Sequence, residues 1–151
     1  MKEFNAENTG NRVVINVASL AEVKRLKQVI VSEMSKHPLG IKLLGSGEVL
    51  DRQVDISGVL EFIKNVVLKV ECSDEFDDAI FDCLKHCTYK TTYQITRDLF
   101  ESDKCIEARE DYYEIIFECI EENLHPFIKS LISTFKTKVA TSTIIQKLSS
   151  M

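Results

Sequence analysis

A helical apolar periodicity in residues 112–122 constrains the fold of this chain more than any other feature. At a step of about 100° per residue, the apolar side chains of this segment form one arc of roughly 200°, and glutamates fill the rest of the circumference. A single neighbouring helix covers less than such an arc. The segment is therefore expected to be either a central core helix or a helix that faces both a core and a partner.

The composition agrees with a helical fold. The 151 residues include five glycines, two prolines and no tryptophan, so turn-forming residues are scarce. Hydrophobic residues make up 44% and charged residues 28%, which is typical of a globular protein of one domain. We expect a mainly α protein: a single helical domain with a small N-terminal β-hairpin.

Helix signals recur along the chain. Ser19 with Glu22 three residues later forms a capping box, and Pro38 disfavours a helix beyond residue 37. Four acidic residues follow Ser73 and suit the first turns of a helix, while Pro126 suits a first helical position. We expect helices at residues 19–37, 57–71, 74–87, 104–124 and 126–140.

The remaining segments carry other signals. Residues 12–18, "RVVINVA", are rich in β-branched residues and follow a turn signal, so residues 1–18 are expected to form the hairpin. Residues 88–96 have β character and suit a short bridge or a turn, after which Thr96 can cap a brief helix. We expect a flexible connection at 38–56 and a frayed tail at 141–151.

Charge is distributed unevenly. Residues 73–125 hold fifteen acidic and five basic residues, whereas residues 126–151 hold four lysines and no acid. One interpretation is a solvated acidic face followed by a helix end that favours cations. The other is that the basic tail of one subunit meets the acidic middle of another subunit or of a partner.

The segment "CLKHC" places Cys83, His86 and Cys87 within one helical turn. With Cys72 or Cys105 as a fourth ligand these groups could bind zinc, but their spacing is not a standard paired-knuckle pattern. A buried cysteine with polar neighbours is the better interpretation. Five cysteines without an apolar signal core favour reduced thiols in a cytoplasm.

The sequence lacks the motifs of several functional classes. It contains no nucleophile elbow, and "GSG" at 45–47 lacks the lysine and hydroxyl residue of a phosphate-binding loop. We therefore expect a protein that is not an enzyme and needs no cofactor or metal. The net charge of −5 opposes nucleic-acid binding, and no apolar run is long enough to predict a membrane span.

Three segments resemble a known family in their order along the chain: "VVINVASLAEVKRLKQVI", "CLKHCTYKTTYQITRDLFE" and "EAREDYYEIIFECIEENLHPFIKSLIS". Together they cover roughly half of the sequence. They resemble the tail assembly chaperones of long-tailed bacteriophages and prophages of Gram-positive bacteria. Each segment is a helix pattern of moderate specificity, and the resemblance depends on their order.

The resemblance implies a mostly helical protein in the cytoplasm of the bacterial host. Such chaperones coat the tape measure protein before the tail tube polymerises around it, and they are absent from the finished virion. Many self-associate, and many exist in a short and a frameshift-extended form. The resemblance thus implies the tape measure protein as partner, contact with the tail tube protein as a further possibility, a homo-oligomer and no catalytic residues.

A chaperone of this kind needs exposed apolar surface flanked by charge. We expect part of the wide arc and of the apolar stripe that follows it to provide this surface. The alternative keeps all these side chains in the protein's own core. Two other functions stay open: a structural phage tail or connector component, and a small helical metal-binding or regulatory protein. The residues predicted to bind the partner are Tyr112, Ile116, Ile120, Phe127, Leu131 and Phe135.

Overall fold

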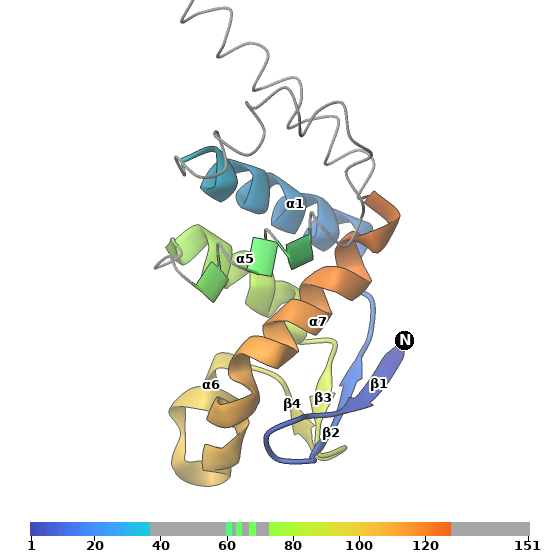
Figure 1. Ribbon diagram of the computed structural model, residues 1–151, viewed down its shortest axis with the longest axis vertical. Coiled ribbons are helices and arrows are strands. Elements are labelled where there is room, and N and C mark those ends of the chain that lie inside the picture. The colour runs from blue at the N-terminus through green and yellow to red at the C-terminus, as the bar shows by residue number, and fades with distance from the viewer. Residues whose placement is uncertain (37–59, 62, 65–66, 69–72, 128–151) are drawn as a thin grey trace, which may run out of the picture. The chain divides into compact units, whose positions relative to one another are not determined.

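The computed structural model of the protein describes residues 1–36, 60, 61, 63, 64, 67, 68 and 73–127 (Figure 1). The chain divides into two compact units, residues 1–29 with 72–125 and residues 30–71 with 126–151. The protein is largely helical, as predicted, and it has a small four-stranded antiparallel sheet where only a hairpin was expected; the expected single domain is not confirmed. The sheet belongs to the first unit.

The predicted N-terminal hairpin is confirmed. Strand β1, Lys2–Asn5, pairs antiparallel with β2, Arg12–Ile15, and Lys2 lies opposite Ile15. Val13 and Ile15 are both fully buried, so alternate side chains of β2 point into the core. Gly10 has a φ of 75° in the connecting loop, a conformation that glycine adopts without strain.

Two further strands extend this hairpin. Strand β3, Thr88–Tyr89, pairs with β2, and β4, Tyr93–Gln94, pairs with β3, so the order is β1-β2-β3-β4. The β character of residues 88–96 was visible in the sequence. Its pairing with a hairpin more than seventy residues away along the chain was not, because no local signal encodes it.

Helix α1, Leu20–Ser35, begins at the predicted capping box. The amide of Ser19 donates to Oε1 of Glu22 at 3.1 Å, and the amide of Glu22 donates to Oγ of Ser19 at 3.3 Å. Two N–H groups of the first turn thus find side-chain acceptors. Val23 and Leu26 are buried, whereas Leu20 is 57% exposed.

Helix α5, Asp74–Leu84, also begins as predicted, because Oγ of Ser73 accepts from the amide of Phe76 at 3.3 Å. It ends three residues before the expected boundary at 87. The chain turns there toward β3, and Cys87 is buried beyond the helix end. In Figure 1, α5 lies beside α7, and the two helices are in contact.

The predicted helix 104–124 is wrong in its first third. Helix α6, Arg97–Glu101, is followed by 3₁₀ turns, η1, over Asp103–Asp111, and only then by the α-helix α7, Tyr112–Leu124. Cys105 interrupts the turns with φ −148° and ψ 75°. These turns bury Cys105, Ala108 and Asp111, and a regular helix would present these side chains in other directions.

Several predictions fall on residues that the structure describes only in part or not at all. Residues 60, 61, 63, 64, 67 and 68 of the expected helix 57–71 are helical. Of the expected helix 126–140, only Pro126 and Phe127 are described, in the 3₁₀ turn η2, His125–Phe127. The connection 38–56 and the tail 141–151 lie outside the described residues.

Candidate binding surface

Five aromatic rings form a continuous row across three helices of the first unit. Centroid distances are 6.1 Å from Phe81 to Phe100, 5.0 Å from Phe100 to Tyr112, 5.2 Å from Tyr112 to Tyr113 and 6.2 Å from Tyr113 to Phe117. These distances suit favourable edge-to-face and tilted ring pairs. We call this set the aromatic row; it joins α5, α6 and α7.

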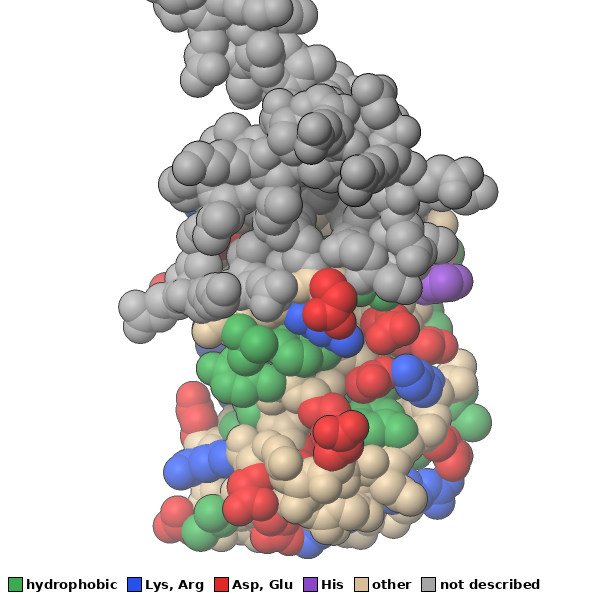
Figure 2. All heavy atoms as spheres, in the orientation of Figure 1, with side chains coloured by type: hydrophobic (Ala, Val, Ile, Leu, Met, Phe, Trp, Pro, Cys, Tyr) green, Lys and Arg blue, Asp and Glu red, His purple; other side chains and the backbone are tan. Residues whose placement is uncertain are grey.

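The aromatic row reaches the surface over most of its length. Phe100 is 8% exposed and anchors the row in the core, whereas Tyr113 is 48% exposed. Phe81, Tyr112 and Phe117 are half-buried. On the face shown in Figure 2, hydrophobic side chains gather in a patch, with acidic and basic side chains beside it. Half-exposed aromatic side chains bordered by charge are characteristic of protein interfaces.

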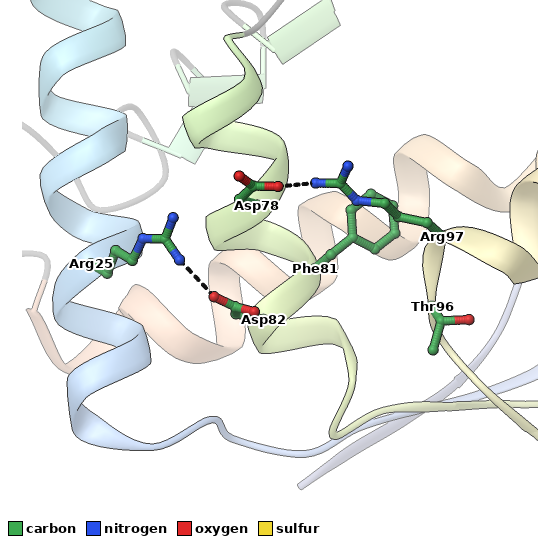
Figure 3. Close-up of a pocket in the computed structure, with 6 residues that line it drawn as sticks. All are labelled: Arg25, Asp78, Phe81, Asp82, Thr96 and Arg97. Carbon is green, nitrogen blue, oxygen red and sulfur yellow. Dashed lines mark hydrogen bonds and ion pairs between the residues drawn. The ribbon is translucent and has the colours of Figure 1, made fainter.

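A groove of about 370 Å³ lies at the Phe81 end of the aromatic row (Figure 3). Nη1 of Arg25 on α1 lies 2.7 Å from Oδ2 of Asp82 on α5. Arg97, at the start of α6, pairs with Asp78 of α5, and its guanidinium lies 5.3 Å from the Phe81 centroid. The groove is lined by Arg25, Asp78, Phe81, Asp82, Thr96 and Arg97.

The start of α5 makes this end of the unit acidic. Asp74, Glu75 and Asp77 occupy the first turn, where the helix dipole favours carboxylates. The pKa of Asp77 is raised, mainly by burial; Arg97 lowers it, while Asp74 and Asp78 raise it further. With Asp78, four carboxylates lie in the first turns of α5, and Arg97 is the cation that lowers the pKa of Asp77.

The residues predicted to bind a partner are divided by the structure. Tyr112 belongs to the aromatic row, but Ile116 and Ile120 are 1% and 2% exposed and lie in the core. Phe127 is half-buried in η2. Leu131 and Phe135 lie outside the described residues. The two isoleucines leave no side-chain surface for a partner.

The predicted partner-binding set omitted two aromatic residues of α7, Tyr113 and Phe117, which belong to the aromatic row. Tyr113 and Phe117 were on the predicted apolar arc, at its edge next to the glutamates, and an edge position was the signal that could have singled them out. Phe81 is half-buried on α5. Its place in a groove depends on Arg25 and Arg97, which come from other elements.

A buried carboxylate fixes the start of α7 against the sheet. Oδ2 of Asp111, a fully buried residue, accepts hydrogen bonds from the hydroxyls of Thr9 at 2.5 Å and Tyr89 at 2.6 Å. Nδ2 of Asn11 donates to the Tyr89 hydroxyl at 2.8 Å. Burial and the bond to Asp111 raise the pKa of Tyr89. Because Tyr112 follows Asp111 directly, this network sets where the aromatic row begins on α7.

A second buried polar residue fixes the other end of α7. Asn123 accepts from the amide of Ala18 at 2.8 Å and donates to the carbonyl of Cys119 at 2.8 Å. Asn123 lies in the last turn of α7, is 1% exposed, and links this helix to the chain just before α1.

The three residues considered for zinc do not share a site. Cys83 and Cys87 are fully buried, and their thiols lie 3.9 Å from the Glu22 carbonyl and 3.8 Å from the Asn16 carbonyl. Burial raises the pKa of Cys83 to about 12, which disfavours the thiolate that a metal needs. His86 is exposed, with Nε2 2.8 Å from Oε1 of Glu22. Within the described ranges, no cluster of three or more His, Cys, Asp or Glu could hold a metal ion.

Comparison with protein-family models, curated proteins and solved structures finds no match to this chain. Across the part of the chain that the structure describes, none of the helices has the length and apolar character needed to cross a membrane. The geometry of the aromatic row, and the resemblance seen in the sequence, are therefore the basis for assigning a function.

Proposed function

We propose that the protein is a non-enzymatic assembly chaperone that binds the tape measure protein during the assembly of a bacteriophage tail. The observation that carries this proposal is the aromatic row, in which Tyr113 is 48% exposed and the half-buried Phe117 lies one helical turn further along α7. The order of the sequence segments that resemble tail assembly chaperones supports it. The acidic residues beside the row fit a partner that is amphipathic.

A tape measure protein is a long amphipathic helix that would aggregate if left alone. Its apolar side chains recur at i, i+3, i+4 and i+7, so it can be covered by a surface that offers apolar side chains at a similar spacing. Tyr113 and Phe117, with ring centroids 6.2 Å apart, have this spacing. Tyrosine suits such a contact because its ring is apolar while its hydroxyl stays hydrated.

The glutamates of α7 show which side of the helix a partner can reach. The amide of Glu7 donates to Glu114 at 3.0 Å, Lys2 pairs with Glu118, and the N-terminal amine lies 3.7 Å from Glu122. The acidic side of α7 is thus engaged with the N-terminal segment of the same unit. A partner helix would approach α7 along the aromatic row.

Co-purification tests the proposal. The chain is co-expressed with the tagged tape measure protein from the same genome, and the amount retained is compared with that of the double variant Tyr113→Ala, Phe117→Ala. Loss of two half-exposed rings from the interface should reduce binding by about tenfold or more. Ile106→Ala, which removes a 59% exposed side chain from η1, is the matched control and should bind normally.

Two results would contradict the proposal. One is a wild-type chain that does not bind the tape measure protein. The other is a double variant that binds as well as Ile106→Ala while both keep the unfolding midpoint of the wild type. Either would exclude the aromatic row as the chaperone surface.

The proposal also places the protein in the host cytoplasm before the tail tube polymerises, and outside the finished virion. Mass spectrometry of purified particles and of the infected lysate measures this directly. The chain should be present in the lysate and absent from the particles. Stoichiometric amounts in the particles would instead indicate a structural tail or connector component.

A further inference from the structure

The two ion pairs that line the groove at Phe81 are open to water. Both are about half exposed: Arg25 and Asp82 are 47% and 44% exposed, and Arg97 and Asp78 are 48% and 54% exposed. Ion pairs this open to water stabilise a fold by at most about 1 kcal/mol. An incoming cation can therefore share Asp78 or Asp82 with little loss to the protein.

The groove also has an apolar floor, and its volume is that of a ligand pocket. The Phe81 ring is half-buried between the two ion pairs, and Arg97 lies over it (Figure 3). A volume of about 370 Å³ falls in the range of about 300–1,000 Å³ that is usual for ligand pockets. Such a site suits a segment that offers apolar side chains and charged groups together.

The negative charge of α5 beside the groove favours the binding of a cationic segment. Besides Asp78 and Asp82, α5 contributes Asp74 and Glu75, both exposed, and the half-buried Asp77. Among the residues that the structure describes, the cations that line the groove are Arg25 and Arg97. Helix α5, which borders the groove, thus carries five carboxylates and no basic residue, so a complementary ligand carries positive charge.

One segment of the sequence combines an excess of positive charge with apolar side chains. Residues 126–151 hold four lysines and no acidic residue, whereas residues 1–72 hold ten basic and nine acidic residues in near balance. The same segment places apolar residues at helical spacing in the sequence: Phe127, Leu131, Ile132, Phe135 and Val139.

We infer that the Phe81 groove of one molecule binds the lysine-rich segment 126–151 of a second copy of the chain. Lysines of the segment pair with the carboxylates of α5, and one of its apolar side chains packs on Phe81. This self-association site shares Phe81 with the aromatic row. It does not depend on the proposed tape measure contact at Tyr113 and Phe117, at the other end of the row. Two copies can exchange their segments reciprocally, which closes the assembly at a dimer.

Charge reversal tests the inference, with self-association measured on the full chain by sedimentation velocity at low salt. The groove variant is Glu75→Lys with Asp78→Lys, and the tail variant is Lys136→Glu with Lys138→Glu. Each alone should weaken self-association by about tenfold or more, because like charges then face each other. Glu7→Lys with Asp103→Lys, exposed positions outside the groove, is the matched control and should stay within about twofold.

Mixing the two variants gives the most specific result. In a mixed dimer, the reversed tail faces the reversed groove and the native tail faces the native groove, so both contacts are complementary again. An equimolar mixture should therefore associate nearly as tightly as the wild type. The milder pair Asp78→Asn with Asp82→Asn should weaken association to a smaller extent and keeps the test valid if the reversed groove folds poorly.

Three results would overturn the inference. The first is a wild type that sediments as a monomer at all concentrations, as it would if the segment bound within its own chain or nowhere. The second is a control that weakens association as much as the groove variant does. The third is a mixture of folded groove and tail variants that does not recover association.

Discussion

Asp111 shows how a single buried charge determines the position of a helix. It is fully buried, its Oδ2 atom accepts two hydroxyl hydrogen bonds, and its Oδ1 atom has no partner among the described residues. Burying a carboxylate is costly unless it is hydrogen-bonded, so the contacts with Thr9 and Tyr89 compensate for that cost. The same contacts join the β1–β2 loop, β3 and the start of α7.

Asp111→Ala should therefore be strongly destabilising. It leaves the hydroxyls of the buried Tyr89 and the half-buried Thr9 without their acceptor, and we expect the free energy of unfolding to fall by about 2–4 kcal/mol. Tyr89→Phe removes one hydroxyl while Thr9 keeps its bond, so it should cost only about 1–2 kcal/mol. Urea unfolding measures both. An Asp111→Ala variant within about 0.5 kcal/mol of the wild type would contradict this role.

Glu22 makes stability depend on pH. Burial raises its pKa, but hydrogen bonds from Lys85, His86 and Ser19 outweigh burial and lower it from 4.5 to about 2. In the unfolded chain the carboxyl takes up a proton near pH 4.5, while in the folded chain it stays ionised. The stabilisation is therefore fully present above pH 4.5 and is lost as pH falls through about 2.

We expect Glu22→Gln to lower the free energy of unfolding at neutral pH by about 1–2 kcal/mol, a value reduced for the exposure of Lys85 and His86 to water. The difference from the wild type should shrink progressively below pH 4.5. Urea unfolding of both proteins across this pH range measures it. A difference that stays constant down to pH 2 would show that the charge of Glu22 is not the cause.

At the scale of elements, sequence signals that span only a few residues predicted the helix starts correctly. The capping box of α1 and the cap of α5 each lie within four residues, and both formed as the sequence indicated. The 3₁₀ turns of η1 could not be predicted in this way. They bury Asp111, and its partners Thr9 and Tyr89 are distant along the chain, so no local sequence signal reports the contact.

Two serines at helix starts allow a matched test of capping. Oγ of Ser73 accepts the amide of Phe76, whereas Ser102, at the start of η1, makes no capping bond with its side chain. Ser73→Ala should lower the free energy of unfolding by about 1 kcal/mol, and Ser102→Ala should change it by only a few tenths. Thermal or urea unfolding of the two variants measures the difference. Equal effects would mean that the hydroxyl of Ser73 is not a cap.

At the scale of the whole molecule, the sequence indicated a helical protein with more apolar surface than one helix pairing needs. It did not indicate which residues reach the surface. Ile116 and Ile120 fill the core of the first unit, while Tyr113 and Phe117, from the edge of the same arc, reach its surface. Periodicity gives the direction of a side chain around its helix. Exposure depends on what the other elements cover, and Phe81 and Phe100 joined the row only through tertiary contacts.

The central claim is that the exposed end of the aromatic row binds the tape measure protein. Hydroxyl-radical footprinting with mass spectrometry tests it most directly, because it reports side-chain accessibility at Tyr113 and Phe117 in the free chain and in the complex. We predict that labelling of both residues falls severalfold in the complex while labelling of Ile106 is unchanged. A complex in which Tyr113 and Phe117 remain labelled as in the free chain would contradict the claim.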